Sequence, residues 1–198
     1  MPLRLHLLLP LGFVFFGGLR WAPGAWVAFL LVIGVHELGH AWMARAVGAQ
    51  PTAIDVHPLG GACRYTGAAS PFSRALVAWG GPLAQLLLLV AALVAFAATG
   101  PVVEPFSLDL RHGLVAANAW LLLLNLLPIP PFDGAEAFKL LPLMAAARAR
   151  ARRSADNQAL ESLIDADARG EVAPETRRLV GELMQSTSRR QKAPSRPR

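Results

Sequence analysis

Long apolar runs separated by short polar stretches dominate the first 127 residues of the chain. Four runs can be distinguished, at about residues 5–19, 24–47, 72–98 and 113–127. A helix needs about 20 apolar residues to cross a bilayer, and the second and third runs reach that length. The pattern predicts an all-α polytopic membrane bundle of about four crossings, in which the last three runs form the core.

The first run is the weakest of the four, because it is short and contains Pro10 and Gly12. A signal peptide would also begin with a basic residue and an apolar stretch, but a small-residue cleavage site is lacking where one would be needed. We therefore expect a short or irregular membrane helix there.

The pattern changes after Leu127. Residues 128–134 contain three prolines and cannot form regular helix. The following stretch, 135–147, is helix-prone but too short and polar to span, so we expect it at the membrane interface. The pattern predicts a membrane domain over 1–149 and a soluble tail over 150–198. In that tail, 156–168 and 174–184 should form short amphipathic helices and 186–198 should be disordered.

The composition agrees with a membrane protein, since 54% of the residues are hydrophobic and only 16% are charged. The net charge of +6 comes mostly from the tail and favours a cytoplasmic flank beside anionic lipid, with no nucleic-acid motif beside it. Arg45, Arg64 and Arg74 lie between the second and third runs. Basic loops face the cytoplasm, so we expect an integral protein of a bacterial-type cell membrane with both termini cytoplasmic.

His36-Glu37-Leu38-Gly39-His40, inside the second run, is the strongest chemical signal. Residues four apart stand above one another on a helix, so both imidazoles can bind one metal ion. Glu37 is displaced by about 100° from His36, close enough to take a proton from water beside the metal. Ionisable residues in a membrane segment usually mark function. The pattern predicts a metal site rather than a chance string.

A catalytic zinc ion needs a third protein ligand and an open position. With Cys63 as the single cysteine, that ligand must be a histidine or a carboxylate. Asp133 is favoured because it follows the proline break, where irregular backbone within a membrane must line a cavity. Its alternative role is to cap the helix that follows. The other candidates, all less favoured, are His57, Glu104, His112 and Glu136.

The two motifs together resemble those of the site-2 protease family, which consists of intramembrane zinc metalloproteases. The resemblance rests on His36–Ala41 and on Asn125-Leu126-Leu127-Pro128-Ile129-Pro130-Pro131-Phe132-Asp133-Gly134. It implies that His36, His40 and Asp133 bind one Zn²⁺ and that Glu37 is the general base and then the acid. It also implies a transmembrane protein as substrate.

Other residues resemble supporting elements of the family. Asn125 would stabilise the site, either through an interhelical hydrogen bond or by polarising the substrate carbonyl. Gly80-Gly81-Pro82 should break the third run, and Gly81 and Pro82 match a Gly-Pro element of the family. Where the family often has asparagine a few positions later, this chain has Gln85, which either supplies a similar amide or leaves that contact absent. Gly60 and Gly61 match a short extended stretch that could pair with substrate; a simple turn is the alternative.

Two further functions remain open from the sequence. A non-proteolytic membrane protein could retain the fold as a metal-binding or regulatory module, although such a chain would usually have lost Glu37 or a ligand. A zinc carrier is also conceivable, but it needs fewer groups. The tail could mediate self-association or bind a regulator.

Overall fold

The structure is a computed structural model, and it describes residues 2–5, 20–57, 60–67, 70–101, 103–176, 178–179 and 181. Residues 6–19 of the predicted first membrane segment and the predicted disordered stretch 186–198 lie outside these residues. The contacts divide the chain into two units, Met1–Met144 and Ala145–Arg198. The predicted boundary between the membrane domain and the tail, at 149/150, stays a prediction.

Two long helices agree closely with the second and third apolar runs. Helix α2 covers Pro23–Ala46 and helix α3 covers Pro71–Thr99. Each begins with proline in its first turn, where a missing N–H costs nothing. Among the described residues these two helices meet the length and hydropathy of a membrane span, with mean hydropathies of 1.5 and 2.2. The prediction of two long apolar helices is confirmed.

The expected break at Gly80-Gly81-Pro82 is wrong, because α3 runs through these residues without interruption. The glycines serve close packing instead. A Cβ atom on Gly39 would lie 2.3 Å from the carbonyl oxygen of Gly80, and one on Gly80 would lie 2.4 Å from that of Gly39. Helices α2 and α3 therefore cross with their backbones in contact, which only glycine at both positions permits.

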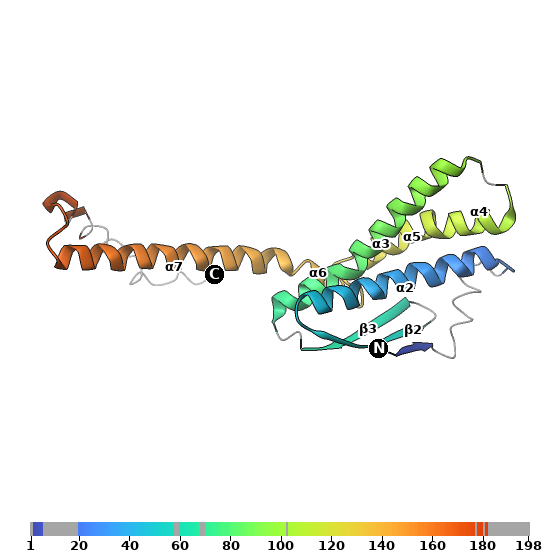
Figure 1. The fold of residues 1–198 in the computed structure, drawn as a ribbon, viewed down its shortest axis with the longest axis horizontal. Coiled ribbons are helices and arrows are strands. Elements are labelled where there is room, and N and C mark those ends of the chain that lie inside the picture. The colour runs from blue at the N-terminus through green and yellow to red at the C-terminus, as the bar shows by residue number, and fades with distance from the viewer. Residues whose placement is uncertain are drawn as a thin grey trace, which may run out of the picture. The chain divides into compact units, whose positions relative to one another are not determined.

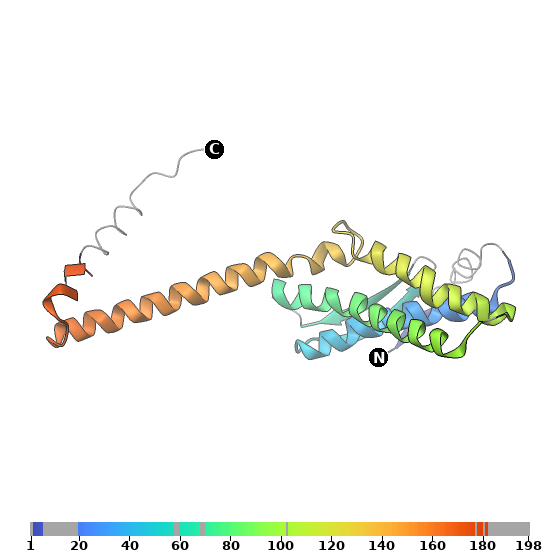
Figure 2. The same ribbon diagram turned by 90° about the horizontal axis from the view of Figure 1, so that it is seen from above.

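The fourth run begins eight residues earlier than predicted. Helix α4 covers Pro105–His112, a π-helical turn covers Gly113–Ala117, and α5 covers Asn118–Asn125. The start moves forward because the Glu104 carboxylate caps α4, accepting hydrogen bonds from two backbone amides at 2.8 and 3.0 Å. Its end before Pro128 is as predicted. Helices α3 and α5 lie side by side in both views (Figures 1 and 2).

The all-α prediction has to be corrected, because a three-stranded sheet lies against α2. Strand β1 (Leu3–Leu5) pairs in parallel with β2 (Gln50–His57), which pairs antiparallel with β3 (Gly60–Thr66). Ile54 and Val56 of β2 are buried against Phe29 and Ile33 of α2. This burial holds the sheet on the helix that carries the two histidines (Figure 1).

Beyond the proline-rich stretch, helix α6 covers Gly134–Ala137 and α7 covers Leu140–Ala168. We predicted two separate helices, at 135–147 and 156–168. This is wrong, because residues 140–147 and all of 156–168 belong to the single helix α7. Pro142 does not end it, because it lies in the first turn, where a proline is tolerated.

Candidate metal centre

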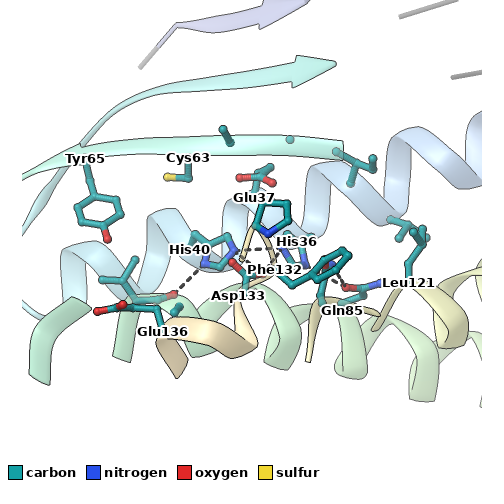
Figure 3. A pocket seen from close by; sticks show the side chains of 18 of the residues that line it. His36, Glu37, His40, Cys63, Tyr65, Gln85, Leu121, Phe132, Asp133 and Glu136 are labelled. Atoms are coloured by element: carbon teal, nitrogen blue, oxygen red, sulfur yellow. Dashed lines mark hydrogen bonds and ion pairs between the residues drawn. The ribbon is translucent and has the colours of Figure 1, made fainter. Parts of the chain in front are cut away.

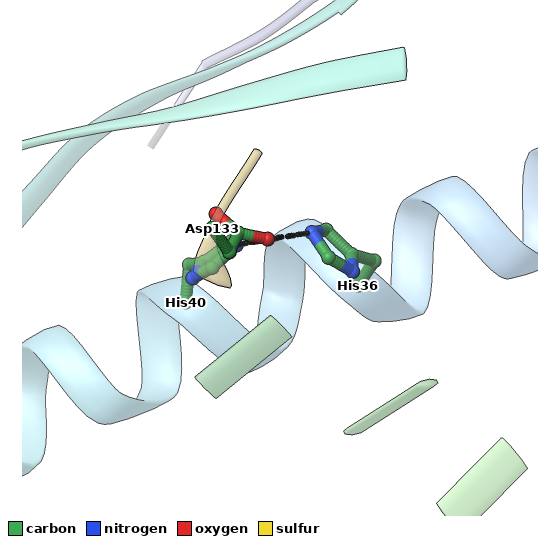
Figure 4. Close-up of side chains that lie close together, drawn as sticks. All are labelled: His36, His40 and Asp133. Carbon is green, nitrogen blue, oxygen red and sulfur yellow. Dashed lines mark hydrogen bonds and ion pairs between the residues drawn. The ribbon is translucent and has the colours of Figure 1, made fainter. Parts of the chain in front are cut away.

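His36 and His40 project from successive turns of α2 toward the same point (Figure 4). Their Nε2 atoms lie 3.0 Å apart. Oδ2 of Asp133 lies 2.9 Å from Nε2 of His36 and 3.3 Å from Nε2 of His40. Three residues from two distant segments therefore form a group that could hold a metal ion.

The three ligand atoms fit a tetrahedral zinc site. Zinc binds imidazole nitrogen and carboxylate oxygen at about 2.0–2.1 Å, so ligand atoms on neighbouring corners stand about 3.3 Å apart. The three observed separations, 2.9 to 3.3 Å, are close to that value. Burial alone would raise the pKa of Asp133, but the two imidazoles beside its carboxylate outweigh this effect and hold the pKa at about 2. The carboxylate is therefore ionised, as a ligand must be.

The local structure around Asp133 leaves its side chain free for this role. Asp133 occupies the N-cap position of α6, yet its side chain makes no capping hydrogen bond. The capping alternative is therefore not used. Gly134 allows the tight turn beside it, because a Cβ atom there would lie 2.4 Å from the carbonyl oxygen of Leu126.

Glu37 lies between α2 and strand β3 and is only 2% exposed (Figure 3). The backbone amide of Cys63 donates a hydrogen bond to its carboxylate, while Oε2 is buried without a hydrogen-bond partner. Gly61 covers the carboxylate so closely that a Cβ atom there would lie 2.5 Å from Oε1. An unpartnered carboxylate oxygen beside three groups that could hold a metal ion suits a residue that accepts a proton from water.

The second ring nitrogen of each histidine is also held. Nδ1 of His36 lies 2.9 Å from Oε1 of Gln85, and Nδ1 of His40 lies 2.8 Å from the backbone carbonyl oxygen of Val77. Metal-binding histidines typically make such a second contact, which fixes ring orientation. Sequence patterns did not place Gln85 on His36; the two signals were an amide in an apolar run and a position near the one where the family often has asparagine.

A cavity of about 700 Å³ opens beside the histidines. Asn125, Phe132 and Asp133 line it, together with Gly61, Ala62 and Cys63 of β3. Gly81 contacts both imidazoles, and Pro82 is buried beside it. The cavity is large enough for an extended peptide segment, within the usual range for ligand sites.

The other predicted candidates take different places. Glu136 lines the cavity but forms ion pairs with Arg74 and Lys139. Glu104 caps α4, and His112 is its last residue. The backbones of His57 and Gly60 lie in β2 and β3, but their side chains are outside the description.

Cys63 lines the cavity without being a candidate nucleophile. Burial, with the nearby Glu37 carboxylate as a second cause, raises the pKa of its thiol to about 11. A thiol with that pKa is almost entirely protonated at neutral pH, so it is a poor nucleophile and a poor metal ligand.

Comparisons with known proteins identify a family and a similar fold. The chain matches the Peptidase M50B-like family over residues 11–127, a range that includes His36, Glu37 and His40 and ends before Asp133. The fold is similar to a solved structure, the site-2 protease from Methanocaldococcus jannaschii, with a TM-score of 0.53 and 20% identity. That likeness covers 70% of this chain and 66% of the archaeal chain. No curated protein matches.

Proposed function

Because the chain belongs to the Peptidase M50B-like family, we propose that it is an intramembrane zinc metalloprotease. It hydrolyses peptide bonds within or near the transmembrane segments of other membrane proteins. The observation that carries the proposal is the convergence of His36, His40 and Asp133 beside the unpartnered oxygen of Glu37. A site for metal and a site for a proton acceptor thus share one cavity.

In this proposal His36, His40 and Asp133 hold one Zn²⁺. When bound, zinc supplies a Lewis acid that acidifies water and polarises a peptide carbonyl. Glu37 accepts the proton of the attacking water on Oε2 and later delivers it to the nitrogen of the departing amine. Its burial under β3 limits the access of bulk water, and its carboxylate lies between β3 and the histidines.

Asn125 supports the reaction from α5. It lines the cavity, and its Nδ2 atom lies 3.4 Å from Oε1 of Gln85. An amide nitrogen carries two hydrogens, so one can bind Gln85 while the other donates to the carbonyl oxygen of a substrate. Both roles considered for Asn125 are compatible in this arrangement.

Strand β3 gives the substrate a place to bind in extended form. It is the last strand in the order β1-β2-β3, so among the described residues its outer edge pairs with no other strand. Gly61, Ala62 and Cys63 of this strand line the cavity. A transmembrane helix hides its peptide bonds in internal hydrogen bonds, and pairing with β3 would hold an unwound stretch open for attack.

The membrane setting rests on the surface of α3 as well as on its length. Leu87, Val90 and Val94 are at least half exposed along this helix, and such an apolar face is unusual for a soluble protein. We propose an integral protein of a bacterial-type membrane, with about four crossings and both termini cytoplasmic. The arginines between α2 and α3 and the basic tail support that orientation. The tail remains a candidate for self-association or for a regulator.

Replacing Glu37 with glutamine tests the proposed function directly. Glutamine retains the shape of the side chain but cannot accept the proton, so cleavage should fall by about 10²- to 10⁴-fold. Fragments of membrane proteins are compared in cells that produce the wild-type or the Glu37→Gln protein. At least one fragment should be present only with the wild type.

A Gly34→Ala protein is the matched control, because a Cβ atom at this position of α2 meets nothing within 4 Å. It should produce the wild-type fragments. Identical fragment patterns in all three strains would contradict the protease proposal and favour the non-proteolytic alternative.

A further inference from the structure

Gln85 is almost completely buried beside the site, with 1% of its surface exposed. Its Oε1 lies 2.9 Å from Nδ1 of His36 and 3.4 Å from Nδ2 of Asn125. Its Nε2 lies 3.2 Å from the backbone carbonyl oxygen of Asn118. One side chain on α3 thus contacts a histidine on α2 and two residues of α5.

These partners determine which way the Gln85 amide faces. A backbone carbonyl oxygen can only accept a hydrogen bond, so the atom of Gln85 that faces Asn118 must be the NH₂ group. The oxygen then faces His36 and Asn125. The amide of Asn125 can then donate to this oxygen. The reverse orientation would place the NH₂ groups of Gln85 and Asn125 together and the Gln85 oxygen against the carbonyl oxygen of Asn118.

The orientation of Gln85 in turn fixes the tautomer of His36. Since Oε1 can only accept, Nδ1 of His36 must carry the hydrogen. In the neutral imidazole Nε2 then has a free lone pair, and Nε2 is the atom that faces Asp133 and His40. His40 reaches the same state because the carbonyl oxygen of Val77, 2.8 Å from its Nδ1, can only accept a hydrogen bond, and this contact is closer than that of the Gly81 backbone N–H at 3.3 Å. The tautomer of His36 is thus set by a side chain, that of Gln85, whereas the tautomer of His40 is set by a backbone carbonyl group.

We propose that Gln85 is a positioning residue of the zinc site, which holds the lone pair of His36 Nε2 on the metal position and aims the Asn125 amide into the cavity. The inference rests on the proposed zinc site. It predicts that the Gln85 side chain raises the affinity of the site for zinc, an effect that its packing between helices alone would not produce.

Zinc affinity of the full-length protein in detergent tests the proposal without any substrate. Zn²⁺ is titrated against a chromophoric chelator for the wild type, Gln85→Met and Gln85→Glu. Methionine fills a similar volume but accepts no such hydrogen bond, so the Kd should rise by about 10- to 100-fold, as for other partners of metal-binding histidines. Glutamate retains the acceptor and should keep a Kd close to that of the wild type.

A purely structural role predicts the reverse order. An apolar side chain would be tolerated at a buried position between helices, and a buried charge would not. The absorption spectrum of the Co²⁺-loaded protein gives a second readout, since it reports the geometry of the ligands. It should change in Gln85→Met and stay unchanged in Gln85→Glu.

Asn118→Leu is the matched control. Its side chain is fully buried at the same contact of α3 with α5, where Nδ2 lies 3.4 Å from the backbone oxygen of Gln85. Leucine removes this side-chain amide but keeps the backbone carbonyl group of residue 118, which accepts from Gln85, and does not affect His36. Zinc affinity should therefore not change.

The possible outcomes separate the two proposals. A wild-type protein that binds no zinc contradicts the proposed function itself. A wild-type protein that binds zinc, together with a Gln85→Met protein of equal affinity and spectrum, contradicts only the role of Gln85. If Gln85→Met fails to fold, a tenfold loss of affinity in a folded Gln85→Glu protein overturns that role, and retained affinity supports it.

Discussion

Replacing Gly81 with alanine is expected to abolish zinc binding. A Cβ atom at this position of α3 would lie 2.3 Å from Nε2 of His40 and 2.6 Å from Nε2 of His36. These two atoms are the proposed ligand atoms, and both rings are held from behind through their Nδ1 atoms. The rings cannot retreat without breaking those hydrogen bonds, so the methyl group takes the space that the metal needs.

The expected loss cannot come from a weaker helix. Alanine stabilises a helix interior by about 1 kcal/mol relative to glycine, so propensity alone would strengthen α3. Zinc content is measured on purified Gly81→Ala and on Gly34→Ala, whose added methyl group meets nothing within 4 Å. A Gly81→Ala protein that retains the zinc affinity of the control would contradict the assigned position of the metal.

Replacing Gly61 with alanine should leave zinc in place and remove activity. A Cβ atom at this position of β3 would lie 2.5 Å from Cγ and from Oε1 of Glu37. The clash falls on the proposed general base and not on the ligands. Displacing that base should lower the cleavage rate by up to about 10²- to 10⁴-fold, the usual contribution of general acid–base catalysis.

The measurement pairs zinc content with the rate of cleavage of a membrane protein that the wild type cuts and the Glu37→Gln protein does not. Gly61→Ala should resemble Glu37→Gln in both readouts, whereas Gly81→Ala should lose both zinc and cleavage. Wild-type cleavage by Gly61→Ala would show that β3 does not confine Glu37 as described.

The candidate ligands could be predicted from the sequence because their signals are local. Two histidines four residues apart share a face of any helix, so His36 and His40 needed no tertiary information. Asp133 was found because a proline-rich stretch interrupts an apolar run. In the structure Asp133 lies 2.9 Å from His36, although 97 positions separate them in the chain. The residue types and their setting were sufficient for this part of the site.

The support of the site depends on how helices and strands pack, and the sequence does not display that. The contact of Gln85 with His36 depends on the crossing of α2 and α3, which is set by Gly39 and Gly80. Gly61 matched a short extended stretch, but its place over Glu37 follows from the docking of β3.

The sheet itself was missed because its hydrophobic pattern is weak. Strand β2 has Pro51 and Asp55 among its eight residues, and β3 begins with two glycines. Such residues are typical of loops. What stabilises the strands is the burial of Ile54 and Val56 on α2, a tertiary effect that outweighs the local preference.

The zinc content of the purified full-length protein tests the central claim most directly. The wild type should contain about one zinc ion per chain, as expected for a site with three protein ligands. Asp133→Ala should lose it, because two histidines on one helix would then hold the ion alone. A wild-type protein without zinc, or an Asp133→Ala protein that binds zinc as tightly as the wild type, would contradict the account.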